Sequence, residues 1–319
     1  MTDFTDALCD HLVFATTVTR VTDLSPSLRR VTVTGADLAH FGTGGPSLDL
    51  RIKLALPATP GGPLSPELLA LRPGMPAPAD HTGWYRRWLA SDPAVRGYLR
   101  TYTVREFRPD AAGHPELDID IVLHGGDSSG PGASFGEHAQ VGDTLAIFGP
   151  NRRLATPAYR GIEFRPGSAN ELLLIGDETA LPAIAAILES LPAPVRGTAL
   201  IEVGEQRDRL PLTTPSSVDV TWLVRGSEFA RGELLDRAIR GLDLARFAAP
   251  GEHAEPEDVN VDDVILWETD TSEQDAFYAW IAGEAGCVKQ LRRYLVREVG
   301  IDRRQIAFMG YWRLGKAEG

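Results

Sequence analysis

Two different hydrophobic patterns divide this chain, and they limit its fold more than any other feature of the sequence. In the first half, β-branched or alternating runs separated by turns predict strands at 13–21, 28–34, 48–56, 98–107, 117–124 and 144–148. In the second half, apolar strand patterns alternate with helical patterns. Strands alone suit a closed antiparallel barrel, whereas alternating strands and helices favour a parallel sheet covered on both faces. We therefore predict two domains of different class.

The second half is predicted element by element from the same patterns. Strands are expected at 171–175, 198–203, 218–224, 276–282 and 305–309, and helices at 181–191, 231–240 and 284–299. A stretch rich in proline, glycine and arginine lies near 150–169, so we predict one domain over 1–155 and a second over 165–319. In the last helix, Arg292, Arg293 and Arg297 are interpreted as a solvated face.

Two segments lie outside this plan. An insertion at 57–96 begins as a proline- and glycine-rich loop, and its aromatic residues Trp84, Tyr85 and Trp88 follow at helical spacing. We expect this helix to pack on the barrel. The acidic stretch 251–275 is open to interpretation as an extra strand, a helix or a flap.

Composition excludes several classes of protein. The 319 residues carry a formal net charge of −12, which disfavours nucleic acid and anionic membrane surfaces as partners. No run of 18 apolar residues and no signal peptide are found, so we expect a cytoplasmic protein. Cys9 and Cys287 lack metal-ligand spacing and are interpreted as reduced thiols, the first in a mobile terminus and the second in a helix. We predict no protein-bound metal and a monomer.

The most informative short segment is the predicted strand 100–105, Arg-Thr-Tyr-Thr-Val-Arg. On a strand, Arg100 and Tyr102 share one face, while Thr103 and Arg105 share the other. This pattern places an aromatic ring beside a guanidinium that can grip phosphate with two hydrogen bonds. It suits a cofactor with a flat ring and a diphosphate, of which FAD is the obvious candidate. An edge strand with scattered surface arginines is the alternative.

The motif Arg-x-Tyr-Thr-x-Arg resembles the flavin-binding signature of the siderophore-interacting proteins, a branch of the ferredoxin-reductase-like flavoenzymes. Segments 118–125 (DIDIVLHG), 176–184 (GDETALPAI) and 310–315 (GYWRLG) match that family in order, and the resemblance covers about 13–317. It implies a six-stranded antiparallel β-barrel that binds FAD, followed by an α/β domain with a parallel sheet that binds NAD(P)H.

The resemblance also implies roles for individual residues. Tyr102 and Thr103 should lie against the flavin ring, and Arg100 and Arg105 should contact the diphosphate or the polar edge of the ring. On the neighbouring strand, the flavin should be held by Asp120, Val122 and His124. The glycine-rich loop 125–134 should bind phosphate through Ala133 and Ser134, although Gly132 and 127–129 depart from the family's Gly-Pro-Ala-Ser element. Lys53 matches a lysine that attracts the ferric complex.

The nucleotide site is less well defined by sequence. The turn at 176–184 lacks a Gly-x-Gly-x-x-Gly fingerprint, and Asp177 and Glu178 repel phosphate, so we expect weak, transient binding of pyridine nucleotide. Thr179 and Ala180 are predicted to reach the flavin or the nicotinamide, and Trp312 to cover the flavin or to pack. Two sets of residues bear on the donor. The acidic residues Glu202 and Glu205 favour NADH. The basic residues Arg207, Arg209 and Arg225 could instead serve the 2′-phosphate of NADPH. We lean towards NADH.

These observations predict an oxidoreductase that passes electrons from NAD(P)H through FAD to the Fe(III) of a siderophore and so releases Fe(II). No catalytic acid–base pair or nucleophile is required, because the cofactor carries the redox chemistry. Two alternatives stay open at this point: a general flavin reductase that donates to a protein partner, and a siderophore- or flavin-binding protein without turnover.

Overall fold

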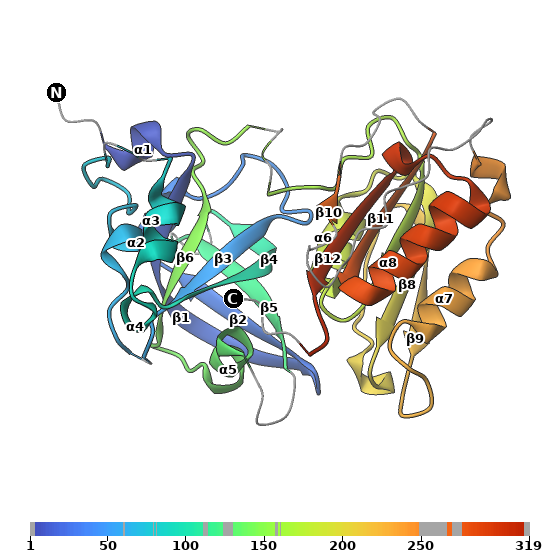
Figure 1. The fold of residues 1–319 in the computed structure, drawn as a ribbon, viewed down its shortest axis with the longest axis horizontal. Coiled ribbons are helices and arrows are strands. Elements are labelled where there is room, and N and C mark those ends of the chain that lie inside the picture. Colours follow the sequence, from blue (N-terminus) through green and yellow to red (C-terminus); the bar gives the residue numbers. More distant parts are fainter. Residues whose placement is uncertain are drawn as a thin grey trace. The chain divides into compact units, whose positions relative to one another are not determined.

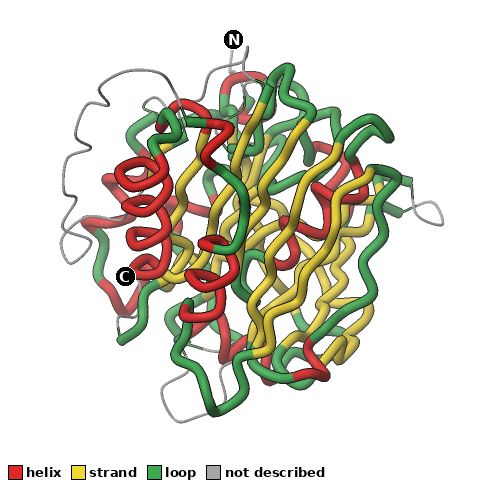
Figure 2. The backbone as a smooth tube through the Cα atoms, turned by 90° about the vertical axis from the view of Figure 1, so that its right-hand side faces the viewer, coloured by secondary structure: helices red, strands yellow, loops and turns green. Residues whose placement is uncertain are grey.

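The computed structural model describes residues 4–59, 61–78, 80, 82–110, 114–123, 130–156, 159, 161–248, 267–269 and 276–315. Contacts divide the chain into two compact units, the first essentially residues 1–162 without 25–27, and the second 163–318 together with 25–27. Figure 2 shows the strands and helices of the described residues. No helix among them is long and apolar enough to cross a membrane.

The first unit is built on a closed barrel with strand order β1-β2-β5-β4-β3-β6 (Figure 1). All six predicted strands are present, as β1 (His11–Ser25), β2 (Leu28–Thr34), β3 (Arg51–Leu56), β4 (Tyr98–Arg108), β5 (Glu116–Val122) and β6 (Thr144–Pro150). Its helices are α1 (Thr5–Leu8), η1 (Ala36–His40), α2 (Pro66–Leu69), α3 (Trp84–Ala90), α4 (Pro93–Arg96) and α5 (Pro131–His138). The predicted barrel class is therefore confirmed.

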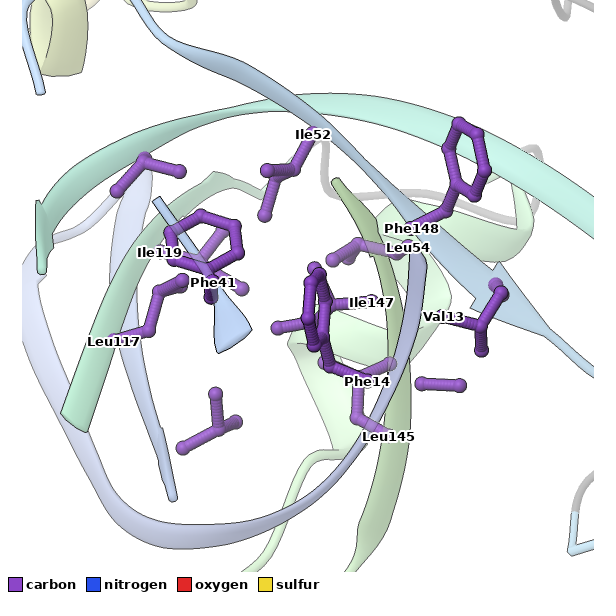
Figure 3. Close-up of a cluster of buried hydrophobic side chains, with 14 of the residues drawn as sticks. Val13, Phe14, Phe41, Ile52, Leu54, Leu117, Ile119, Leu145, Ile147 and Phe148 are labelled. Atoms are coloured by element: carbon purple, nitrogen blue, oxygen red, sulfur yellow. The ribbon is translucent and has the colours of Figure 1, made fainter. Parts of the chain in front are cut away.

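Alternation along the strands builds the barrel core. Phe14, Ile52, Leu54 and Ile147 are buried side chains that point into the barrel, where Phe41 joins them (Figure 3). The ring centroids of Phe14 and Phe41 are 5.4 Å apart in an edge-to-face contact, an arrangement that aromatic pairs favour. The core fixes which face of each strand is left for other functions.

The aromatic residues of the insertion pack on the barrel, as predicted. Trp88 is buried in the barrel's hydrophobic cluster, and Trp84 packs against it with its ring 4.6 Å from that of Phe148. Tyr85 stays largely exposed. One expectation was wrong: Cys9 does not belong to a mobile terminus, because it is buried in the same cluster after α1. Burial also raises the pKa of its thiol.

The second unit contains a six-stranded sheet of order β10-β12-β11-β7-β8-β9, parallel except for β10. Its strands are β7 (Glu171–Gly176), β8 (Arg196–Val203), β9 (Ser217–Val224), β10 (Trp267–Glu268), β11 (Phe277–Glu284) and β12 (Ile306–Trp312). Its helices are α6 (Leu181–Ser190), η3 (Gln206–Asp208), α7 (Glu233–Arg240), η4 (Ala245–Phe247), α8 (Ala285–Arg293), the π-helical η5 (Tyr294–Val299) and η6 (Arg303–Gln305). The predicted α/β class is confirmed.

Helices cover both faces of this sheet. Ile175 of β7 packs in one hydrophobic cluster with Leu235 of α7 and Val288 of α8. Helices α7 and α8 lie side by side in Figure 1. The next residue, Gly176, faces the other way, where Ala180 and Ile184 at the start of α6 lie against it. Because β8 and β11 flank β7 on opposite sides, the chain reverses its direction of winding between β7 and β11, and ligands of such sheets bind at that point.

Two further expectations need correction, and a third segment is described in part. Helix α5 begins at Pro131, so Ala133 and Ser134 lie in its first turn and not in a loop. Arg292 is not part of a solvated face, because it is 6 % exposed and forms a bidentate pair with Glu268 at 2.6 and 3.0 Å. Of the acidic stretch, only 267–269 is described, and there Trp267 and Glu268 form β10.

Candidate functional site

Strand β4, which carries the Arg-x-Tyr-Thr-x-Arg motif, lies between the barrel core and an edge that has no paired strand among the described residues. Arg100 is paired with Leu54 and Tyr102 with Ile52, so both side chains are on the side of the strand that carries the core residues. Tyr102 packs against the core cluster, and burial raises the pKa of its phenol to about 12 although Arg100 opposes the shift. The phenol is therefore neutral at physiological pH.

The open edge arises where β4 and β5 separate. Their register begins at Val104↔Ile119, and the pairs recorded for residues 98–103 of β4 join it to β3 alone. Among the described residues, the β5 side of this part of β4 therefore has no paired strand, and a flat ligand can approach it there. A ring placed along this edge can touch Tyr102 from one face of the strand and Thr103 from the other. Sequence patterns give no signal for this separation, because strand pairing is a tertiary property.

The first turn of α5 packs against Arg100 and Tyr102 of β4. A Cβ atom added at Gly132 would lie 2.6 Å from Tyr102 Oη and 3.3 Å from Arg100 Cβ, so only glycine allows the helix to approach. Ala133 and Ser134 follow in the same turn, and Ala133 is buried. The positive end of the helix dipole and its free N–H groups suit a phosphate. The structure thus brings Arg100, Tyr102, Ala133 and Ser134 together.

Four of the predicted residues are not among those that the described structure brings to this place. Asp120 is 5 % exposed, and both of its oxygens accept from Arg30, at 2.7 and 2.8 Å. It therefore serves an ion pair between β2 and β5. Val122 is buried at the end of β5, and His124 lies outside the described residues. Arg105 is the extra residue of a β-bulge between Val104 and Glu106, which interrupts the expected alternation.

The outer face of β3 and β4 carries the predicted substrate residue. Lys53 pairs with Thr101 and Arg51 with Thr103, so the four side chains share one face, as the alternation predicts. Lys53 Nζ donates to Thr101 Oγ1 at 3.0 Å. Two cationic side chains therefore lie next to Thr103, the residue predicted to contact the flavin ring.

The remaining predicted residues gather in the second unit, at the carboxyl ends of β7, β11 and β12. Asp177 is 3 % exposed, and its Oδ1 accepts from the amide of Thr179 at 2.9 Å and from its hydroxyl at 2.5 Å. Its Oδ2 accepts from Glu284 N at 2.9 Å and from Trp312 Nε1 at 2.8 Å. Asp177 thus connects all three strands at the point of reversed winding, a role that sequence analysis missed.

Electrostatics separate the two neighbouring carboxylates. Burial, reinforced by Glu178, raises the pKa of Asp177. Burial also acts against the ionisation of Glu178, but Arg231 and Arg225 outweigh it and hold the pKa of Glu178 below its usual value. The guanidinium of Arg231 also lies 4.8 Å from the centre of the Trp312 ring. The Trp312 ring is therefore held by a hydrogen bond at its edge and by a cation–π contact on its face.

Two of the predicted nucleotide contacts are enclosed. Ala180 is fully buried, and its amide donates to the Asp177 carbonyl. Glu202 is also fully buried, and its oxygens accept from Arg225 and from Gly232 N. Glu205 is exposed and pairs with Arg207 at 3.1 Å. Of the two acidic candidates for a ribose diol, only Glu205 is therefore accessible.

Comparison with known proteins finds two family models that match consecutive parts of the chain. A family model described as a siderophore-interacting FAD-binding domain matches residues 17–154, and one described as siderophore-interacting protein matches 169–315. The ferric vibriobactin reductase ViuB of Vibrio cholerae is 30% identical over 295 residues, which cover 92% of this chain and 87% of ViuB. The chain belongs to the siderophore-interacting protein family.

Solved structures place this siderophore-interacting protein among related folds. The siderophore-interacting protein SipS from Aeromonas hydrophila is 30% identical, with a TM-score of 0.63 and coverage of 97% of this chain and 94% of SipS. A siderophore utilization protein from T. fusca is 27% identical, with a TM-score of 0.64 and coverage of 99% and 97%. A ferredoxin reductase of carbazole 1,9a-dioxygenase, 16% identical with a TM-score of 0.53 and coverage of 95% and 70%, shares the fold. The architecture is thus ferredoxin-reductase-like.

Proposed function

We propose that this protein is an FAD-dependent reductase of ferric siderophores that takes electrons from NAD(P)H. The observation that carries the proposal is the close approach of the first turn of α5 to β4, with Gly132 against Tyr102, beside the part of β4 that has no β5 partner among the described residues. The ferric-reductase name of a relative at 30% identity supports the same reaction. FAD would be bound by the first unit and the nucleotide by the second.

The residues of the barrel fit the parts of FAD. The Tyr102 ring and Thr103 would contact the flavin ring system, Arg100 or Arg105 its diphosphate or polar edge, and the Ala133 amide with the Ser134 hydroxyl a phosphate. A bound flavin supplies the conversion of a two-electron hydride into single electrons. Lys53 and Arg51 would attract an anionic ferric complex to the face that Thr103 shares. Fe(II) is then held weakly by hard oxygen ligands.

In the second unit, Asp177 would keep Thr179 and Trp312 in place where nucleotide approaches. The carboxylates there disfavour a tightly bound diphosphate, so we propose a transient encounter with the donor. Because Glu202 is enclosed, the choice between NADH and NADPH depends on Glu205, which would favour the ribose diol of NADH, and on Arg207, which could serve the 2′-phosphate of NADPH. We place the reaction in the cytoplasm, where reduced nucleotide is available, and propose a monomer.

Anaerobic stopped-flow absorbance tests the proposal. The purified protein, reconstituted with FAD, is mixed first with NADH or NADPH and then with a ferric tris-hydroxamate in the presence of an Fe(II) trap. Bleaching by nucleotide, reoxidation by the ferric complex and appearance of trapped Fe(II) are expected. A protein that recruits no FAD would refute the proposal, while bleaching without reoxidation by ferric chelates would indicate a reductase for a protein partner.

A further inference from the structure

The turn between β7 and α6 offers a dinucleotide few of the backbone groups that usually hold its diphosphate. In sheets of this kind the diphosphate lies at the turn between the first strand and the following helix, on free amides. Here the amide of Thr179 donates to Asp177 Oδ1 at 2.9 Å, and that of Ala180 donates to the Asp177 carbonyl at 3.0 Å. Pro182, in the first turn of α6, has no amide hydrogen. A diphosphate that binds here therefore depends mainly on side chains.

Two arginines that follow β9 meet at Glu178, the second residue after β7. Arg225 Nη2 lies 3.1 Å and Arg231 Nη1 2.7 Å from Glu178 Oε1. Arg225 also pairs with Glu202 at 3.0 Å, and its side chain is only 12% exposed. The side chain of Arg231 is 23% exposed, and in the described part of the chain its Nε and Nη2 donate no hydrogen bond. Arg231 therefore has a pair of donors available to a ligand.

Two contacts hold the Arg231 guanidinium in place without using these donors. Its Nη1 is bound to Glu178, and its central carbon lies 4.8 Å from the centre of the Trp312 ring. The edge of a guanidinium that carries Nε and Nη2 can bind a phosphate with two parallel hydrogen bonds. Because the side chain is already ordered, the binding of a ligand to this edge costs less conformational entropy.

We infer that Arg231 binds the diphosphate of NAD(P)H through Nε and Nη2, and that Glu178 positions Arg231 for this contact. The inference rests on the proposed function. Glu178 follows β7 at the point where the winding of the sheet reverses, which is where the diphosphate of a dinucleotide lies. A 2′-phosphate would lie instead beyond the end of β8, near Arg207. We therefore expect Arg231 to serve NADH and NADPH alike.

The surrounding charges leave Arg231 able to attract an anion. Glu178 and Glu202 are both buried, and they pair with the guanidiniums of Arg225 and Arg231. Two cations thus match these two carboxylates, so Glu178 does not repel phosphate as its place in the sequence predicts. Burial raises the pKa of Asp177, which lowers the population of its charged form. One arginine in a balanced cluster gives modest affinity, which suits a donor that binds and leaves.

The test measures binding of the diphosphate apart from transfer of the hydride. FAD-loaded wild type, Arg231→Gln and Arg231→Lys are titrated with ADP-ribose, which contains the diphosphate but neither the nicotinamide nor a 2′-phosphate. The rate of anaerobic flavin bleaching is then followed against the concentrations of NADH and of NADPH. Arg237→Gln is the matched control, because Arg237 also pairs with a glutamate, Glu233, and lies 5.1 Å from an aromatic ring, that of Phe229. It lies in the last turn of α7, whereas Arg231 precedes that helix.

Arg231→Gln should raise the Kd for ADP-ribose, and the concentration of either nucleotide that gives half-maximal bleaching, about 10–100-fold. The bleaching rate at saturating nucleotide should stay at the wild-type value, because the diphosphate does not react. Arg231→Lys keeps the charge beside Glu178 but lacks the fork, so it should lose less, and the control should lose nothing. A wild-type Kd in both Arg231 variants, or a loss confined to NADPH, would overturn the inference. If neither nucleotide bleaches the wild-type flavin, the proposed function fails instead.

Discussion

The contact between Gly132 and Tyr102 leads to a quantitative prediction. An alanine at position 132 places its Cβ 2.6 Å from Tyr102 Oη and 3.1 Å from Tyr102 Cε2, distances that the side chain or the helix must relieve by moving. Overpacking of this kind costs about 1–3 kcal/mol. Alanine recovers up to about 1 kcal/mol over glycine inside a helix. We therefore expect Gly132→Ala to lower stability by about 1–2 kcal/mol.

Two measurements follow from that value. In thermal melts a loss of 1 kcal/mol corresponds to about 2–4 °C for a unit of this size, so Tm should fall by about 2–8 °C. Displacement of the Tyr102 ring would also remove about 1–1.5 kcal/mol of stacking on the flavin, which raises the Kd for FAD about tenfold. Fluorescence titration of the apoprotein with FAD measures this change.

Gly45→Ala provides the matched control. It is the same chemical change in the same unit, but its Cβ meets nothing within 4 Å and its backbone does not need positive φ. Its Tm and its FAD affinity should stay at the wild-type values. If Gly132→Ala behaved like this control in both assays, the proposed contact of α5, Tyr102 and flavin would be wrong.

Three further predictions test other contacts. Asp118 is buried, but hydrogen bonds from Arg108 and Thr32 outweigh burial and hold its pKa below the usual value; its stabilisation is therefore present at neutral pH and lost as pH falls below about 4. Asp118→Asn should cost about 3 kcal/mol at pH 7 and should flatten the loss between pH 5 and 3 in urea titrations. Trp312→Phe removes a donor from Asp177, whose pKa burial already raises. Stability is lost as pH rises through a raised carboxyl pKa, so this variant should lose about 1–2 kcal/mol more at pH 8 than at pH 5, and an equal loss at both values would contradict the assignment. Tyr102→Ala should weaken FAD binding at least tenfold or alter the bound flavin's spectrum, and normal occupancy with an unchanged spectrum would count against the flavin site.

Local patterns were sufficient to predict most of the fold. Alternation of apolar residues marks each barrel strand, since one face of every strand lines the core that contains Ile52 and Ile147. The start of α5 was missed because Gly130-Pro131-Gly132 is typical of a loop. Proline is also favoured in the first turn of a helix, where its missing N–H is no loss. In this chain α5 begins at Pro131.

Tertiary partners explain what the sequence could not predict. Arg292 and Glu268 are 24 residues apart and pair through the sheet edge, which no local spacing reveals. Asp120 matched the family motif, yet its geometry is set by Arg30 on the neighbouring strand. The separation of β4 from β5 likewise depends on strand order and register.

The two-residue strand β10 has a consequence for the solubility of the protein as well as for its fold. Trp267 and Glu268 pair with Met309 and Phe308 of β12, an apolar strand that would otherwise present unpaired backbone groups on that side. The bidentate grip of Arg292 on Glu268 holds this short cover in place. Exposed apolar edges recruit strands from other molecules. Loss of that single ion pair should therefore show itself first as aggregation at high concentration, before any loss of flavin chemistry.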